Sequence, residues 1–211
     1  MRKASRGPGR PPAAKAAETR ERIVEAARQV FSELGYDAAT FQEIAVRADL
    51  TRPAINHYFK TKNLLYREVV KRTNELVVLR SVGKASEATT LIDQLEAFIN
   101  AAVGTDAEDR SAAAFLVTSV LESQRHPELR RDENDSLLGT RQFLNWAVNG
   151  AIERGELTTD APVEPLVEML TAMFWGMAFY AGFVGSHEEL EAITDEFKRL
   201  LVGKLWNWRD T

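Results

Sequence analysis

Apolar residues recur along most of the chain at three- and four-residue steps, the period of an α-helix that packs one face against a core. The first clear run begins after Thr19 and ends at Gly35, a residue typical of helix C-termini. Further runs predict helices at about 41–48, 51–59, 62–82, 91–103, 110–124, 128–154, 163–184 and 187–207. No segment shows the alternation of a strand, so the pattern predicts an all-α fold.

Two short helices near the N-terminus are marked by their start signals. Thr40 and Glu43 have the spacing of a capping box, in which a hydroxyl and a carboxylate each satisfy a free amide. Thr51 has the position of the next N-cap, and Pro53 falls in the first turn, where its missing N–H costs little. Asp49 lies at the turn between the helices and tolerates a left-handed backbone. Together with the preceding helix, the pair predicts a helix-turn-helix.

The helix at 51–59 keeps a polar face that its own small core does not need. Arg52, Pro53, Asn56 and His57 share this face, and Arg, Asn and His match the donors and acceptors of base edges in a major groove. Hydroxyls and an ammonium suited to phosphate oxygens surround it: Thr40, Thr51, Tyr58 and Lys62. A three-helix bundle with an accidental polar face is the alternative.

The net charge of −4 conceals two regions of opposite sign. Residues 1–72 contain 15 Lys or Arg and 8 Asp or Glu, whereas the remainder contains 12 and 23. Such asymmetry suggests a polyanion as the partner of the first region.

Residues 19–70, "TRERIVEAARQVFSELGYDAATFQEIAVRADLTRPAINHYFKTKNLLYREVV", resemble the TetR family of transcriptional repressors. The resemblance implies a DNA-binding domain whose third helix enters the major groove. By position, Gln42, Arg52, Pro53, Asn56 and His57 would then face bases. Thr40, Thr51, Tyr58 and Lys62 would hold phosphates. Asp49, Asn56 and His57 depart from the residues common in the family, so the operator cannot be copied from a relative.

Three regions are expected on this basis. Residues 1–17 are rich in Arg, Lys, Gly, Pro and Ala and should form a disordered basic arm. Residues 18–78 would be the TetR-type helix-turn-helix domain, and residues 79–211 a helical ligand-binding and dimerisation domain. Within the arm, "RGPGRPP" is similar to an AT-hook core, which would place Arg6 and Arg10 in an A·T minor groove. A plain disordered tail remains the other interpretation.

The last two predicted helices, 163–184 and 187–207, are the candidate homodimer interface. Both carry apolar residues at helical steps, and the first also carries small residues that allow close approach. Two such hairpins would form a four-helix bundle, an arrangement that the resemblance also implies. Packing within one chain is the alternative.

The acidic region also offers aromatic residues that would line a pocket for a small apolar effector, which the resemblance implies. They are Phe98, Phe115, Phe143, Trp146, Phe174, Trp175 and Tyr180. Each of them is equally typical of an ordinary core.

The hypothesis that follows is a repressor that an effector releases from double-stranded DNA. Two reading helices roughly 34–36 Å apart would occupy successive major grooves of a palindromic operator. The effector would favour a different separation, with the helix from Lys62 as the lever. An architectural, ligand-independent DNA-binding protein is the alternative, and activation instead of repression also remains open.

Other classes find little support in the sequence. It has no Cys, no HExxH or other metal-ligand spacing and no nucleophile motif, so we expect no enzyme, metal or cofactor. Met169 to Gly185 is uncharged, but it falls short of the roughly 20 residues that span a membrane. We therefore expect a helix buried on several sides by protein, in a cytoplasmic protein.

Overall fold

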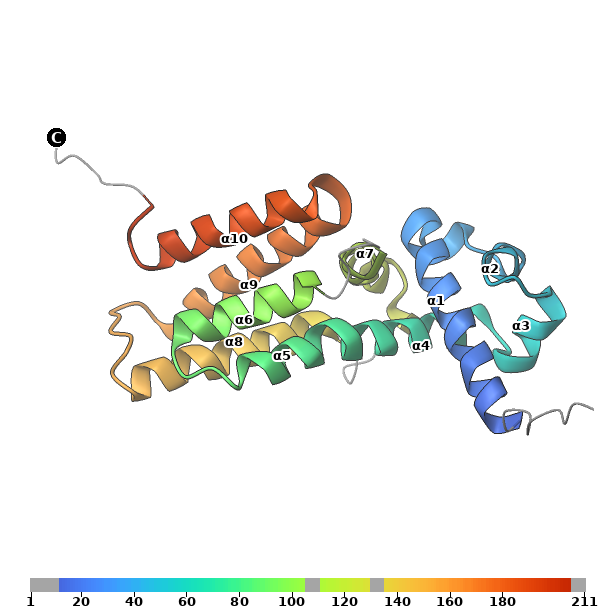
Figure 1. Ribbon diagram of the computed structural model, residues 1–211, viewed down its shortest axis with the longest axis horizontal. Helices are drawn as coiled ribbons and strands as arrows, with labels where there is room; N and C mark the ends of the chain where they lie inside the picture. The colour runs from blue at the N-terminus through green and yellow to red at the C-terminus, as the bar shows by residue number, and fades with distance from the viewer. Residues whose placement is uncertain (1–11, 105–110, 130–134, 206–211) are drawn as a thin grey trace, which may run out of the picture. The chain divides into compact units, whose positions relative to one another are not determined.

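The computed structural model describes residues 12–104, 111–129 and 135–205, and all regular secondary structure in these ranges is helical. This confirms the predicted all-α class. The chain divides into two compact units between Val69 and Val70, inside a helix and earlier than the boundary expected at residue 78 (Figure 1). The first unit contains α1 (Pro12–Ala38), α2 (Phe41–Arg47), α3 (Arg52–Tyr58) and the start of α4 (Lys62–Asn74).

The second unit continues from α4 without a break in helical structure. Its elements are η1 (Glu75–Leu79), α5 (Arg80–Ala85), α6 (Leu91–Gly104), α7 (Ser111–Arg125), η2 (Pro127–Leu129), α8 (Ser136–Glu153), α9 (Val163–Phe179), η4 (Tyr180–Val184) and α10 (His187–Leu201). The segments η1 and η4 are π-helical, and η2 is a 3₁₀ turn.

Helix α1 begins earlier than its apolar pattern predicts. Residues 12–17 were expected in the disordered arm, yet they are helical. The reason is local, because four of these six residues are Ala, the best helix former, and Pro is tolerated at a helix start. At the other end Gly35 adopts φ 76° and ψ 173°, which an L side chain rarely adopts. The regular helix is therefore interrupted at Gly35, as predicted, and a short helical piece after this kink completes α1 to Ala38.

The core of the first unit forms where α1, α2, α3 and α4 present their apolar faces. The side chains of Ile23, Ile44, Ile55, Leu65 and Val69 are fully buried in it. An ion pair adds to this packing, because Arg20 Nη1 on α1 donates to Glu68 Oε1 on α4 at 2.6 Å. That hydrogen bond raises the pKa of Arg20, so the pair keeps its charge.

The second unit is held together by one large apolar cluster. Helix α6 packs against α5, α8 and α10, and α9 packs against α8 and α7. Aromatic rings link these layers: Phe98 stacks on Phe143 with ring centroids 4.7 Å apart, and Phe174 lies 5.4 Å from Phe98 and 6.0 Å from Phe197. The core therefore spans four helices, and Lys198 of α10 pairs with Glu96 of α6 at its edge.

Two predicted helices contain a wide turn that the apolar pattern does not reveal. In η1 the Arg80 N–H donates to the Glu75 carbonyl, and in η4 the Gly185 N–H donates to the Tyr180 carbonyl. Each bond spans five residues instead of four, which defines a π-turn. Near η4, a Cβ on Gly182 would lie 2.7 Å from the backbone nitrogen of Ala114. Close packing of η4 on α7 therefore requires Gly at this position.

Two other predicted helices have different ends in the structure. The expected helix 128–154 starts only at Ser136, because the Asp135 side chain caps it by accepting from the N–H groups of Leu137 and Leu138 at 3.0 and 3.1 Å. Residues 130–134 lie outside the described ranges. The expected helix 187–207 ends at Leu201, shortly before Gly203, whose φ of 66° is left-handed.

Candidate nucleic-acid interface and internal cavity

The two short helices are fixed by the caps that the sequence predicts. Thr40 Oγ1 accepts from the Glu43 N–H at 3.2 Å, and Glu43 Oε2 accepts from the Thr40 N–H at 2.8 Å, which completes the capping box. Thr51 Oγ1 accepts from the Ala54 N–H at 3.4 Å. Each such cap stabilises a helix by about 1 kcal/mol. Both hydroxyls therefore have a structural task, whether or not they also contact phosphate.

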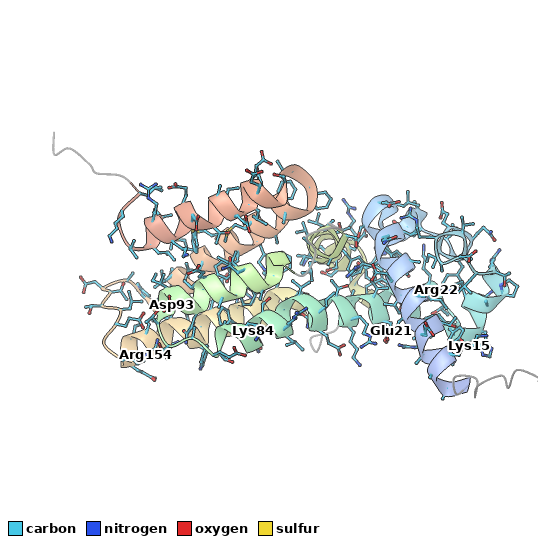
Figure 2. All side chains as sticks on the ribbon, in the orientation of Figure 1. Lys15, Glu21, Arg22, Lys84, Asp93 and Arg154 are labelled. Atoms are coloured by element: carbon cyan, nitrogen blue, oxygen red, sulfur yellow. The ribbon has the colours of Figure 1, made fainter. Side chains whose placement is uncertain are left out.

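The turn between α2 and α3 sets their mutual pose. Asp49 has φ 51°, the left-handed conformation expected for it, and the Leu50 N–H donates to the Ala45 carbonyl at 2.9 Å. Arg22 of α1, which is labelled in Figure 2, donates to the Asp49 carbonyl at 3.3 Å, so the first helix also holds this turn. With Ile55 fully buried behind it, α3 has a fixed outward face.

That outward face is polar, exposed and without internal partners. Gln42 on α2 and Arg52, Pro53, Asn56 and His57 around α3 are all exposed. Within the described residues, the side chains of Gln42, Arg52, Asn56 and His57 make no hydrogen bond or ion pair. The half-buried Tyr58 meets the His57 ring edge-on, with centroids 5.3 Å apart. The structure thus brings the predicted base-facing residues onto neighbouring short helices and leaves their donors and acceptors available.

Lys62 has a different role from the one expected. Its ammonium donates to the carbonyls of Tyr36, Asp37 and Ala39 at 2.6, 3.0 and 3.1 Å and lies 4.5 Å from the centre of the Tyr36 ring. An ammonium has three N–H donors, and these bonds use all of them. Lys62 therefore closes the C-terminal end of α1, where carbonyls lack helical partners. Gly35 marks this helix end in the sequence, but it does not show which side chain donates to the carbonyls there.

A neighbouring lysine is free of this structural task. Lys60, two residues after the end of α3, is exposed, and within the described residues its ammonium makes one long hydrogen bond, 3.3 Å, to the Asn56 carbonyl. The sequence analysis did not single out Lys60, because Lys60 occupies no position of a recognised motif. The other predicted cations, Arg6 and Arg10, lie outside the described residues.

The second unit contains a cavity that is partly open to solvent. Phe98, Phe174 and Trp175 of the predicted pocket residues line it. The remaining wall consists of Val77, Val78, Ile99, Ala102, Ala113, Leu116, Thr140, Met177, Ala178, Ala181 and Leu190. Val77 and Val78 belong to η1, and Ala181 belongs to η4, so both π-helical segments contribute to the wall. Sequence reasoning searched for aromatic residues and therefore missed most of these smaller side chains, although Met177 was also expected there.

Four predicted pocket residues lie elsewhere. Phe115 and Phe143 are buried in the core and do not line the cavity. Trp146 is 50% exposed on α8, because it faces outward one turn from the core position of Phe143. Tyr180 lines a second, open hollow between α9 and α10, together with Met173, Gly176, Ile193 and Leu200.

The outer face of α9 and η4 carries large apolar side chains that are about half exposed. Met169, Phe179, Phe183 and Val184 are 50, 50, 46 and 56% exposed. The sequence predicted that this apolar stretch is buried by protein on several sides, yet only 22% of its most apolar window is buried. By length and composition alone, Val163–Val184 could cross a membrane. In the described residues, no group of three or more His, Cys, Asp or Glu side chains is arranged for a metal ion.

Comparison with known proteins decides what these features belong to. Residues 23–69 match the model of bacterial regulatory proteins of the tetR family, and residues 91–202 match the C-terminal domain of BetI-type transcriptional repressors. The second match alone covers more than half of the chain. The chain belongs to the TetR family of transcriptional regulators. The resemblance found in residues 19–70 is thereby confirmed, and the TetR-family assignment makes the exposed α3 face part of a DNA-binding domain.

Individual relatives agree with the TetR assignment. The HTH-type transcriptional repressor BepR of Brucella suis is 30% identical over 77% of this chain and 80% of its own. UidR of Escherichia coli K12 is 22% identical over 75% of this chain and 79% of its own. The fold is shared with Bacillus subtilis FadR, solved in complex with stearoyl-CoA, at a TM-score of 0.71 and 23% identity over 88% of this chain and 99% of that one. The family and these relatives are regulators and not enzymes.

Proposed function

We propose that this TetR-family protein is a cytoplasmic homodimeric repressor, released from a palindromic DNA operator by a small, largely apolar effector. The observation that carries the proposal is the outward face of α3. Its polar side chains are exposed and lack partners within the described residues, while caps and a buried Ile55 fix the helix that bears them. A face of this kind fits base edges in a major groove.

The roles of the interface residues follow from their chemistry and exposure. Arg52, Asn56 and His57, with Gln42 from α2, would bond to base edges, and Pro53 would make an apolar contact. Thr40, Thr51 and Tyr58 would contact phosphates alongside their structural roles. We place the cationic phosphate contact on Lys60 instead of Lys62, because the Lys62 ammonium is fully engaged by carbonyls. Arg6 and Arg10 remain candidates for a minor groove.

The half-exposed apolar face of α9 and η4 supports a homodimer. Met169, Phe179, Phe183 and Val184 are each about half exposed. Burying the remainder of such a side chain contributes on the order of 1 kcal/mol. Gly176 and Ala172 are exposed among them and let a second backbone approach closely. A second copy of this hairpin would cover the face in a four-helix bundle and pair two α3 helices for a two-fold operator.

Coupling between effector and DNA is supported by where the cavity lies. Val77 and Val78 line it, and they belong to η1, which continues directly from α4. Helix α4 begins in the DNA-binding unit, since the division falls at Val69 and Val70. An occupant of the cavity would therefore touch the helix that leads to α3. Release of DNA by about 100-fold requires only about 2.7 kcal/mol of coupling.

The test begins with a selection of bound sequences from random duplex DNA. We expect a palindrome with half-sites about one helical turn apart. Fluorescence anisotropy on that site, in the presence of a panel of apolar metabolites, should then reveal a compound that weakens binding. The double variant Arg52→Ala with Asn56→Ala is the control that loses the site itself. Binding with no sequence preference, unaffected by every compound, would favour the architectural alternative, which predicts no cavity.

A further inference from the structure

The cavity and the open hollow between α9 and α10 meet at one residue of α9. Phe174 and Ala178 line the cavity. Met173 and Gly176 line the hollow. Met177 lines both, and among the described residues no other residue does so. Successive residues of an α-helix are turned by about 100°, which places Met177 between the two sets around the helix axis. Met177 therefore has the cavity on one side and the hollow on the other.

The Met177 side chain is suited to a partition that can move. Methionine is unbranched and has three rotatable side-chain bonds, so it adapts to irregular space at little cost. Met177 is half-buried, and the neighbouring Gly176 adds no side chain on the side of the hollow. The position that a Cβ of Gly176 would occupy is surrounded by open space. The hollow therefore offers room into which Met177 can turn.

The walls of both compartments favour the same kind of ligand. Within the described residues, Glu196 is the one charged residue in either wall, and it pairs with Arg199 at 2.9 Å. The Thr140 hydroxyl donates to the Ser136 carbonyl of its own helix at 2.9 Å. Most of the remaining wall is hydrocarbon or thioether. An alkyl chain that passes from one compartment into the other would stay in apolar surroundings, and each methylene group that it buries favours binding.

We propose that the cavity and the hollow form one site for an effector with a long unbranched alkyl chain, and that Met177 turns aside to let this chain through. The passage that one methionine side chain vacates has the width of an unbranched chain, so a branched chain of the same composition does not fit. In the proposed homodimer a second copy would cover the hollow, which makes it an enclosed extension of the cavity. The inference rests on the proposed function, because it assigns the cavity to the effector.

Three neutral alcohols separate the effect of chain length from that of chain shape. 1-Decanol and 2-propyl-1-heptanol are isomers, the first unbranched and the second branched, and 1-hexanol is a shorter unbranched compound. Calorimetric titration of the full-length protein measures their binding without DNA. We expect 1-decanol to bind on the order of 100-fold more tightly than 1-hexanol, because the four added methylene groups are buried. The branched isomer should bind about tenfold more weakly than 1-decanol.

Variants of two apolar residues connect the preference for the unbranched isomer to Met177. Met177→Ala removes the side chain that must turn aside, so the branched isomer should bind within about twofold of 1-decanol. Leu121→Ala on α7 is the matched control, because Leu121 is 56% exposed and lines neither compartment, and it should leave the preference unchanged. Circular dichroism checks that both variants are folded. The comparison of the alcohols on the wild type tests the proposal even if Met177→Ala is unfolded.

Four results would overturn the proposal. They are equal affinity of the wild type for 1-decanol and its branched isomer, no gain in affinity from 1-hexanol to 1-decanol, no binding of any of the alcohols, and an unchanged preference in folded Met177→Ala. The proposed function fails separately. If the alcohols bind with the expected preferences but no apolar compound releases the selected operator, the effector switch is wrong and the site for the alkyl chain stands.

Discussion

The exposed faces of α2 with α3 and of α9 with η4 are both suited to a partner, but the first is polar and the second is apolar. On the first, Arg52, Asn56 and His57 expose donors and acceptors that find no partner within the described residues. On the second, Phe179 and Phe183 keep apolar rings that are about half exposed. Unpaired polar groups select a partner by the pattern of its hydrogen bonds, whereas uncovered apolar groups select one by its shape. The first face is therefore suited to reading a sequence, and the second to permanent assembly.

The largest effect is expected when a charge is placed on the apolar face. Phe183→Asp should weaken the homodimer by at least about 100-fold, because a carboxylate would have to be buried against a second copy. Analytical ultracentrifugation measures the change. Leu79→Asp, which also replaces an apolar side chain by a carboxylate but at a 55% exposed position of η1, is the control and should leave assembly intact. If the wild type is monomeric at micromolar concentration, or stays in solution only when bound to lipid vesicles, a second copy of the chain does not cover the apolar face.

The polar face should lose specificity without losing stability. Asn56→Ala and Arg52→Ala should each cost about 1–3 kcal/mol on the selected site and much less on random DNA, because base contacts carry the discrimination. Lys60→Ala should instead weaken both alike and lower the salt slope by about 1. Anisotropy at several salt concentrations distinguishes these patterns. Equal losses on both kinds of DNA for all three variants would contradict the division of roles.

Lys62 should behave as a structural residue beside this interface. Lys62→Met keeps the aliphatic stem but removes three hydrogen bonds to carbonyls, so we expect a loss of about 1–3 kcal/mol in the free energy of unfolding. Chemical denaturation measures it, with Lys60→Met as a control that should stay close to wild type. At temperatures where Lys62→Met is folded, its salt slope for DNA should equal that of the wild type. A lower slope would return Lys62 to the phosphate contacts.

The smallest effect concerns the helix caps. Thr51→Ala should cost about 1 kcal/mol of stability, and Thr51→Ser should cost less, because Ser keeps the capping hydroxyl. Thermal unfolding compares the two. Full stability of Thr51→Ala would mean that α3 is held by Ile55 and its neighbours alone.

Sequence reasoning succeeded where a signal is local. The caps at Thr40 and Thr51, the stop at Gly35 and the left-handed Asp49 depend on a few adjacent residues, so their spacing was sufficient to predict them. The same local signals placed the polar face of α3 correctly on the surface.

Sequence reasoning failed where the surroundings of a side chain depend on residues distant in sequence. Lys62 bonds to carbonyls more than 20 residues away, which no motif encodes. Trp146 and Phe143 are three positions apart on α8, yet one is half exposed and the other is buried. Apolar character alone could not show which aromatic ring faces a cavity, a core or the surface. The apolar pattern of Met169 to Gly185 likewise could not show how much of this stretch its own chain covers, which is 22% of the most apolar window.

The wide turn in η1 has a consequence for sequence change in the connecting helix. A π-turn accommodates one residue more than a regular α-turn does. Removing one exposed residue there, such as Leu76, would leave an unbroken α-helix with the flanking faces in their original directions. A single-residue deletion inside α4 or α5 would instead turn every later side chain by about 100°. Single-residue deletions should therefore be tolerated at exposed positions within residues 75–79 and rejected on either side.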